Sequence, residues 1–274
     1  MSGPVAWLLN GSVALILTGL GAGLVVDDFV RLRAHGLRFV LLLGVMVVGM
    51  PAVAFGLGRV LGLEAAFVMG LVVLAAAPAG PLSSAFTGLA RGDVAQAVML
   101  VASSTLVSLV SMPLVLRLAS QSQVEGAVPV ELLLFMVALV LVPVSTGMFV
   151  RRRSVAVAER IASIAKTLAV VVLAAAIVLV VIAQREKLLE ALPKVGVAVV
   201  VLNLLQLGVG FLVGGRTVGP ALSFGVRNGS IALAVAGAPA LGLDASALLP
   251  IAVYAGVQSV TTALIIGWRR RVTS

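Results

Sequence analysis

Apolar runs of about 20 residues follow one another along almost the whole of this 274-residue chain. Each run is long enough to cross a bilayer core about 30 Å thick. Hydrocarbon offers no hydrogen-bond partners, so backbone N–H and C=O groups there must bond to one another, as they do in helices. The composition agrees, since 61% of the residues are hydrophobic and only 11% are charged. The sequence therefore predicts an all-α integral membrane protein that forms a single domain over residues 1–274.

The apolar runs predict about nine transmembrane spans. We expect them at residues 5–26, 39–61, 65–90, 94–116, 132–150, 161–183, 195–213, 218–239 and 245–268. Of the nineteen lysines and arginines, this topology places twelve on one side of the membrane, five on the other and two inside spans. Because basic residues gather on the cytoplasmic side, we expect the N-terminus outside and the C-terminus in the cytoplasm, in a plasma or inner membrane.

Composition and spacing also exclude several classes of function. The net charge of +9 does not indicate nucleic-acid binding, because the basic residues lie in short gaps between apolar runs. The chain has no cysteine, hence no thiolate metal site and no cysteine nucleophile. No cluster of His, Asp and Glu has metal-ligand spacing, and no phosphate-binding loop is present. We therefore expect neither an enzyme nor a bound cofactor or metal.

Two of the predicted spans, the third and the eighth, are interrupted near their middles by glycine, proline and small polar residues, over 76–84 and 219–229. In a membrane, a broken helix is tolerated only where it is buried in protein or lines a watery cavity. Breaks at corresponding places in two halves of a chain point to the binding site of a transporter. The residues that we expect to form such a crossing of two broken helices are Pro78, Gly80, Pro81, Ser223 and Gly225.

The order of the spans predicts an internal repeat. Each broken span is followed by an intact one, and the two broken spans run in opposite directions across the membrane. This arrangement is typical of inverted-topology repeats. We expect a first repeat of four spans over about 1–118 and a second of five spans over about 130–268.

Four short motifs carry a resemblance to a known family. Residues 78–84 read Pro-Ala-Gly-Pro-Leu-Ser-Ser, and residues 89–95 read Leu-Ala-Arg-Gly-Asp-Val-Ala. They resemble the Pro-Gly-Gly-Thr-Ala-Ser-Asn crossing motif and the "LA(K/R)GDVA" turn of the bile acid:sodium symporter family, within the bile, arsenite and riboflavin transporter superfamily. Residues 104–106 are similar to the Ser-Thr-Leu of that family, and residues 225–228 resemble its "E-x-G-x-Q-N" break.

The resemblance implies a secondary transporter built from a panel domain and a core domain. In this family two broken helices cross near the midplane, and the usual activity is sodium-coupled uptake of organic anions. The positive ends of helix dipoles at such a crossing suit an anionic substrate, while unwound carbonyls suit a cation.

Several side chains depart from the family pattern. Ser223 stands where the family has a carboxylate, Arg227 where it has glutamine, and Ser84 where it has asparagine. Only Ser83 keeps a residual sodium-site side chain. A buried cation needs oxygen ligands and a compensating negative charge, so a guanidinium at this place favours loss of the family-type sodium sites.

Arg227 has two interpretations from the sequence. Its fixed charge could replace the bound cation and hold the two breaks together through their carbonyl oxygens, or it could receive the anionic group of a substrate. Thr105 and Gln258 are further candidates because each lies on the helix that follows a broken span. The residues that we expect to contact the substrate are Arg227, Asn228, Ser83, Ser84, Thr105 and Gln258.

We therefore expect a secondary transporter of small or amphipathic organic anions that works by alternating access, with membrane lipid as its other partner and no nucleic acid. Three alternatives stay open. The chain could be a conventional sodium symporter with divergent ligands, a non-transporting receptor or subunit of a complex on the same fold, or a passive channel. A channel differs in having a continuous wet pore and a flux that does not saturate.

Overall fold

A computed structural model of the chain shows an all-helical protein. It describes residues 14–15, 17–19, 21–23, 36–121, 130–238 and 242–272. Within these ranges the backbone forms helices, short connections and one isolated β-bridge, with no named strand. The all-α prediction is therefore confirmed.

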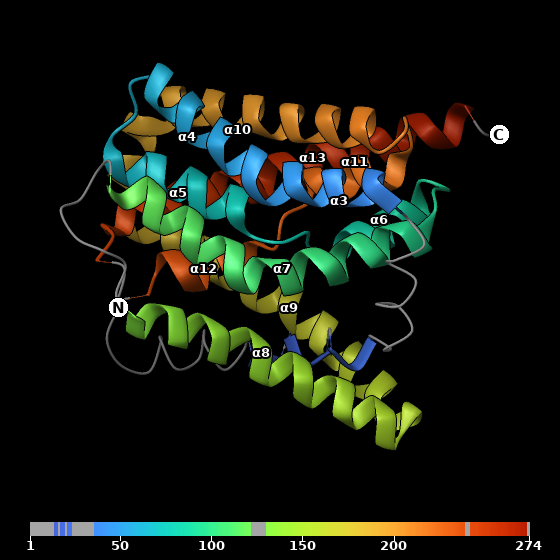
Figure 1. Cartoon of the computed structure of the whole chain (residues 1–274). Helices are drawn as coiled ribbons and strands as arrows, with labels where there is room; N and C mark the ends of the chain where they lie inside the picture. Colours follow the sequence, from blue (N-terminus) through green and yellow to red (C-terminus); the bar gives the residue numbers. More distant parts are fainter. Residues whose placement is uncertain are drawn as a thin grey trace.

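The helices follow the order of the predicted spans (Figure 1). They are α3 (Gly36–Gly44), the π-helical turn η2 (Val45–Gly49), α4 (Met50–Val60), α5 (Ala65–Ala76), α6 (Leu82–Leu89), α7 (Val94–Gln121), α8 (Val130–Arg153), α9 (Val155–Ala183), α10 (Arg185–Val213), α11 (Val218–Gly225), α12 (Gly229–Ala236), the short 3₁₀ turn η4 (Ala245–Ala247) and α13 (Leu248–Val272). All but the first predicted span fall on one of these helices or on consecutive helices. That first span lies largely outside the described residues.

Three helical stretches of the described ranges are long and apolar enough to cross a membrane. They are Phe39–Val60, Arg185–Val213 and Ala245–Val272, and a bent pair of helices within α7 would be a fourth if the pair counts as one span. The first of these stretches contains η2, which ends two residues before Pro51. Proline has no N–H to continue the helical ladder, and the wider π-helical turn adjusts the backbone at that point.

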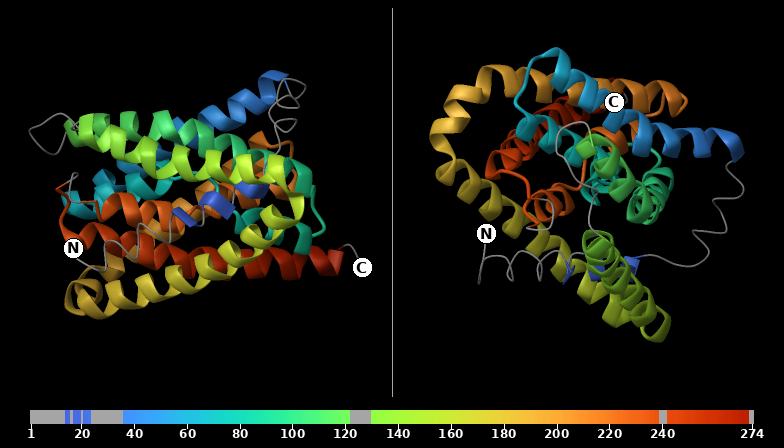
Figure 2. Two further views of the ribbon diagram at one scale, coloured as in Figure 1. Left: turned by 90° about the horizontal axis from the view of Figure 1, so that it is seen from below. Right: turned by 60° about the vertical axis from the view of Figure 1, so that its left-hand side comes forward.

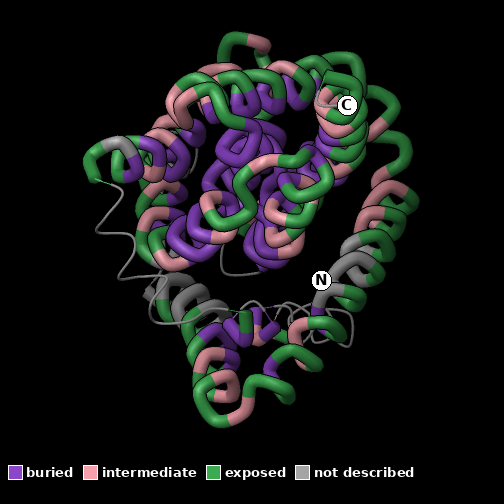
Figure 3. Tube along the Cα trace, turned by 90° about the vertical axis from the view of Figure 1, so that its right-hand side faces the viewer, coloured by how far each residue is buried: buried purple, intermediate pink, exposed green. Residues whose placement is uncertain are grey.

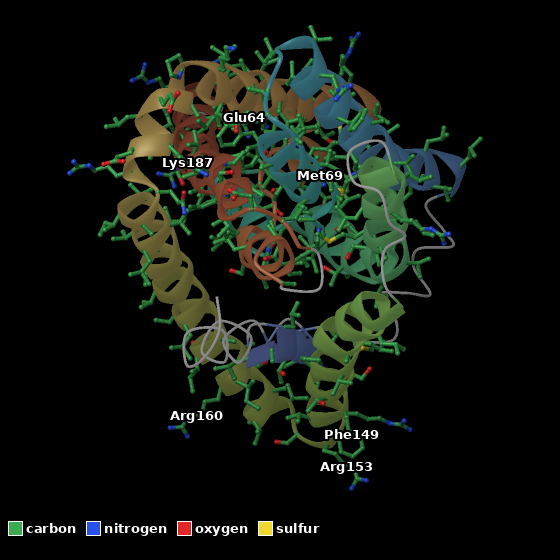
Figure 4. All side chains as sticks on the ribbon, turned by 90° about the vertical axis from the view of Figure 1, so that its left-hand side faces the viewer. Glu64, Met69, Phe149, Arg153, Arg160 and Lys187 are labelled. Atoms are coloured by element: carbon green, nitrogen blue, oxygen red, sulfur yellow. The ribbon has the colours of Figure 1, made fainter. Side chains whose placement is uncertain are left out.

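One group of helices lies beside the rest of the molecule. It consists of α8, α9 and the described residues between 14 and 23 (Figures 1 and 2). The packing within this group is close, because a Cβ added to Gly147 of α8 would lie 2.0 Å from the carbonyl oxygen of Thr18. At the C-terminal end of α8, the guanidinium of Arg153 lies 5.1 Å from the ring centroid of Phe149 (Figure 4).

The outer helices expose apolar side chains. Figure 3 shows buried residues concentrated in the main group of helices, whereas α9 is largely exposed. Its exposed apolar residues include Val155, Val157, Ile164, Leu168, Val171, Val178, Leu179 and Ile182. A surface of this kind is suited to contact with lipid tails and is unusual for a protein in water.

The two interrupted spans form the centre of the main group. Every residue from 67 to 80 and from 218 to 229 is buried. α5 packs against α4, α7 and α13, and α11 packs against α6, α7 and α10. The breaks in these spans are therefore enclosed by protein, which is the condition under which irregular backbone is tolerated in a membrane.

Gly70 allows α5 to approach the turn η4. A Cβ added to Gly70 would lie 2.1 Å from the carbonyl oxygen of Ala247, a backbone atom that cannot move without shifting the turn. We therefore predict that Gly70→Ala lowers stability by about 1–3 kcal/mol through overpacking. Thermal unfolding of the purified protein in detergent measures the effect.

Gly56→Ala is the matched control for this substitution. Gly56 is also helical, in α4, and an added Cβ would meet nothing within 4 Å. Alanine favours the helix over glycine by up to about 1 kcal/mol, so this variant should be at least as stable as the parent. Equal melting temperatures for Gly70→Ala and Gly56→Ala would contradict the proposed contact between α5 and η4.

An ion pair outside the predicted spans connects the start of α10 to the start of η4. Lys187 (Figure 4) donates to a carboxylate oxygen of Asp244 at 3.4 Å. The same oxygen accepts hydrogen bonds from the N–H and the hydroxyl of Ser246, at 2.8 and 2.6 Å. These bonds, mainly the one from the Ser246 hydroxyl and then that from its N–H, lower the pKa of Asp244 from about 3.8 to about 2.

The lowered pKa of Asp244 predicts a pH-dependent contribution to stability. The ionised carboxylate favours the folded state above pH 3.8, and this contribution is lost as the pH falls toward 2. We therefore expect Asp244→Asn, which keeps a helix-capping oxygen, to be slightly less stable than the parent at pH 7, by an amount that shrinks below pH 4. Melting curves from pH 7 to pH 3 test this, and a difference that grows toward acid would contradict it.

Candidate functional site

The first break consists of residues 77–81 and has a local cause in two prolines. Pro78 disfavours helical geometry at the residue before it, and Ala77 accordingly has φ −60° and ψ 145°. α5 therefore ends at Ala76. Pro81, with φ −56°, suits the start of a helix, and α6 begins directly after it.

The second break is shorter than the sequence suggests and consists of residues 226–228. Pro220 lies in the first turn of α11, where a proline starts a helix instead of breaking it. α11 ends at Gly225, and Val226 is extended, with φ −110° and ψ 95°. Asn228 restarts the helix, because its side-chain oxygen accepts a hydrogen bond at 3.2 Å from the N–H of Ile231 and caps α12.

The two breaks lie against each other and pair through an antiparallel β-bridge. The N–H of Gly80 donates to the carbonyl of Val226 at 2.7 Å, and the N–H of Asn228 donates to the carbonyl of Pro78 at 2.9 Å. Gly80 permits this close approach, since a Cβ there would lie 3.0 Å from the carbonyl oxygen of Arg227, a tighter contact than most side chains make. Main-chain atoms therefore join the two interrupted helices at their breaks.

Side chains from the neighbouring helices bond the remaining amides of the crossing. The N–H of Ala79 donates to the hydroxyl oxygen of Ser104 in α7 at 3.1 Å. The N–H of Arg227 donates to the side-chain oxygen of Gln258 in α13 at 3.1 Å. With these two bonds, every backbone N–H group in both breaks has an acceptor. A buried, non-helical backbone requires such acceptors, because an unpaired N–H group buried away from water costs free energy.

A polar network from α10 and α13 surrounds the C-terminal carbonyl of α11. The Asn203 side-chain amide donates to the Gly225 carbonyl oxygen at 2.9 Å, and the Tyr254 hydroxyl lies 2.9 Å from the same oxygen. Asn203 also donates to Tyr254 at 3.0 Å and accepts from Thr261 at 2.8 Å, while the Tyr254 hydroxyl bonds to Gln206. The network holds the end of α11 against the intact helices on either side of it.

Removal of the Tyr254 hydroxyl tests this network. Tyr254→Phe leaves Asn203 without one acceptor and the side-chain oxygen of Gln206 without its donor, all in a buried site. We predict a loss of about 1–3 kcal/mol in stability. Ser259→Ala on the same helix is the control, because that exposed hydroxyl bonds only to a carbonyl of its own helix. Thermal unfolding of both variants should separate them, and a Tyr254→Phe variant as stable as Ser259→Ala would contradict the role of the network.

Arg227 is a buried cation with only part of its guanidinium bonded. The side chain is 2% exposed, and its Nη1 donates to the carbonyl of Ala77 in the opposite break at 3.1 Å. The guanidinium carbon lies 5.8 Å from the ring centroid of Phe224. Nε and Nη2 have no acceptor among the described residues, and no carboxylate in that part of the chain forms an ion pair with Arg227.

The other predicted site residues divide into two sets. The hydroxyls of Ser83 and Ser223 and the side-chain NH₂ of Asn228 are buried at the crossing, and no described residue bonds to them. Ser84 and Thr105 instead donate to carbonyls one turn earlier in their own segments, at 2.8 and 2.7 Å. The structure thus gives unbonded polar groups to Ser83, Ser223 and Asn228, in or beside the two breaks, whereas the hydroxyls of Ser84 and Thr105 are bonded.

The site residues expected from the sequence leave out two side chains that support the crossing. Tyr254 is the only tyrosine of the chain and lies four residues before Gln258, so both face the same side of α13. The spacing of four residues from Gln258 could have identified Tyr254 as a residue that supports the crossing. Ser104, which bonds to Ala79, directly precedes Thr105 in a serine-rich stretch. Nothing in the local pattern distinguishes these two hydroxyls.

Comparison with known proteins gives one family and several relatives. The sequence profile of the Sodium Bile acid symporter family matches residues 12–191. An uncharacterized sodium-dependent transporter of Bacillus subtilis is 28% identical over 205 residues, which is 74% of this chain. The human hepatic sodium/bile acid cotransporter is 28% identical over 135 residues, or 46% of this chain, and the mouse sodium/bile acid cotransporter 4 is 30% identical over 158 residues, or 55%.

The matched regions cover only part of these relatives. They amount to 61% of the Bacillus protein, 38% of the human protein and 36% of the mouse protein. The chain thus covers less than two thirds of the length of each relative.

Proposed function

Because the chain belongs to the sodium bile acid symporter family, we propose that it is a secondary transporter that carries small or amphipathic organic anions across a membrane by alternating access. The names of the relatives support transport, since one is called a sodium-dependent transporter and two are called bile acid cotransporters. Apolar helices around two enclosed breaks support a membrane location and a site at the crossing. The symporter family also agrees with a protein that is not an enzyme.

The proposed topology has nine spans in two inverted repeats, over about 1–118 and 130–268. The antiparallel pairing of the two breaks supports it, because inverted repeats require the broken spans to run in opposite directions. Each broken pair is also followed by a long helix, α7 in one case and η4 with α13 in the other. The N-terminus would lie outside and the C-terminus in the cytoplasm.

The observation that carries the proposal is the bond between Arg227 and Ala77. A guanidinium nitrogen from the second break donates to a carbonyl of the first break, at a place where a bound cation would attract the same oxygen. No carboxylate in the described ranges offsets this charge. We propose that Arg227 supplies the positive charge that sodium supplies in the family, so that transport does not depend on sodium.

Other polar side chains would complete the substrate site. The residues that we propose beside Arg227 are Ser83, Ser84, Thr105, Asn228 and Gln258. The unbonded donors of Ser83 and Asn228 support their inclusion most directly. Thr105 would have to release the carbonyl of its own helix before it could bond to a substrate.

Sodium dependence of thermal stability tests the role of Arg227. In sodium-free potassium buffer titrated with sodium chloride, the parent protein should show no shift beyond that given by potassium chloride. Arg227→Gln, which returns the residue that the family has at this place, should gain a sodium-dependent shift that follows RT ln(1 + [Na⁺]/Kd). Arg59→Gln, at an exposed arginine at the end of α4, is the control and should behave like the parent.

A sodium shift in the parent protein would overturn the replacement of the cation by Arg227. It would favour the second candidate, a conventional sodium:organic anion symporter with divergent ligands, which the names of the relatives support. Uptake of cholate, a bile acid with a free carboxylate, into proteoliposomes, with and without a sodium gradient, tests transport itself. Saturable uptake without sodium supports the proposal, whereas uptake that depends on the gradient supports the second candidate.

A further inference from the structure

The guanidinium of Arg227 presents one complete unbonded edge. Nη1 is held by the carbonyl of Ala77, while Nε and Nη2 have no acceptor among the described residues. These two nitrogens lie on the same side of the planar group, with their N–H bonds roughly parallel. This is the edge that binds the two oxygens of a carboxylate in a bidentate pair.

The crossing holds a second buried donor without a partner. The side-chain NH₂ of Asn228, the next residue, also lacks a partner in the described part of the chain, because the Asn228 oxygen is used to cap α12. Buried charges in proteins are normally paired and buried N–H groups normally bonded. A metal cation cannot satisfy N–H groups, whereas an acceptor with negative charge would bond to them and would also offset the buried charge of the guanidinium.

Apolar side chains also lie at the crossing. Ala77, Ala79 and Phe224 are buried against the crossing, and the Phe224 ring lies beside the guanidinium. The contact with the ring and the bond from Nη1 hold the guanidinium in one orientation, so the free edge is preorganised. An apolar neighbourhood also excludes water and strengthens the attraction between unlike charges.

We propose that Arg227 binds the carboxylate of a monocarboxylic acid through Nε and Nη2, with a further bond from the Asn228 NH₂ and the apolar part of the ligand against Phe224. The inference rests on the proposed function, because the carboxylate is that of the transported anion. It narrows the substrate from organic anions in general to monocarboxylates with an apolar body. The edge is enclosed in this conformation, so the ligand enters when the surrounding helices separate during transport.

Ligand-dependent thermal stability in sodium-free buffer tests the inference directly. The probes are potassium benzoate, the uncharged analogue benzamide, and potassium chloride. In the parent protein benzoate should raise the melting temperature, and neither benzamide nor chloride should do so. Arg227→Gln should lose the shift. Arg227→Lys keeps the charge but offers no planar edge, so its affinity for benzoate should fall about tenfold.

Two results of this titration would overturn the inference. One is a benzoate shift that persists in Arg227→Gln, because the carboxylate would then bind elsewhere. The other is an equal shift from potassium chloride, which would show a site for any small anion. Arg59→Gln again serves as the control for loss of a positive charge and should keep the benzoate shift.

A substitution at Asn228 tests the inference in an experiment that needs no added ligand. Asn228→Asp keeps the oxygen that caps α12 and replaces the unbonded NH₂ by a second carboxylate oxygen. If the edge requires a carboxylate, this variant should melt at a higher temperature than the parent in the absence of ligand, and benzoate should not raise it further. Asn228→Ser, which can also cap the helix but carries no charge, should show no such gain.

The aspartate should stabilise the protein only when Arg227 is present, so Arg227→Gln with Asn228→Asp should lose the gain. An Asn228→Asp variant no more stable than Asn228→Ser, together with no benzoate shift in the parent, would overturn the inference. If cholate uptake without sodium is still observed in that case, the proposed function stands and only the carboxylate contact at Arg227 is lost.

Discussion

The structure depends on one requirement, that backbone amides in the two breaks find acceptors where water is excluded. The bonds from Gly80 to Val226 and from Asn228 to Pro78 meet part of it with main-chain atoms alone. Ser104 and Gln258 meet the rest from two intact helices. The same requirement thus explains why the two interrupted helices lie together and why polar side chains of α7 and α13 point at them.

Arg227 connects this backbone arrangement to function. One end of its guanidinium takes part in joining the breaks, through the carbonyl of Ala77, and the other edge is left for a ligand. The two interpretations of Arg227 that the sequence leaves open are therefore compatible, because they use different nitrogens of the same group. The bond to the Ala77 carbonyl fixes the orientation of the guanidinium, and a specific anion site needs such a fixed orientation.

The sequence predicts the helices and the places of the breaks well, because their causes are local. Pro78 ends α5 through its effect on Ala77, and Asn228 caps α12 through a bond three residues away. The hydrogen-bond partners were less predictable, since Ala79 and Ser104 are 25 residues apart and Arg227 and Gln258 are 31 apart. Such pairs depend on how helices rotate against one another, which periodicity does not specify. The extent of the second break was wrong for a different reason. Pro220 suggested a break, but proline occurs both in breaks and in the first turn of a helix, where it lies here.

The main-chain pairing of the two breaks has a consequence for evolution. Hydrogen bonds between an N–H and a carbonyl are available to almost any sequence, so replacing a side chain beside the crossing does not remove them. Gly80 is the most constrained position, because a Cβ there would lie only 3.0 Å from the carbonyl oxygen of Arg227. The side chains at positions such as 223 and 227 can therefore change while these main-chain bonds persist. Selection can therefore change which ion or substrate the crossing favours by single substitutions, without passing through an unfolded intermediate.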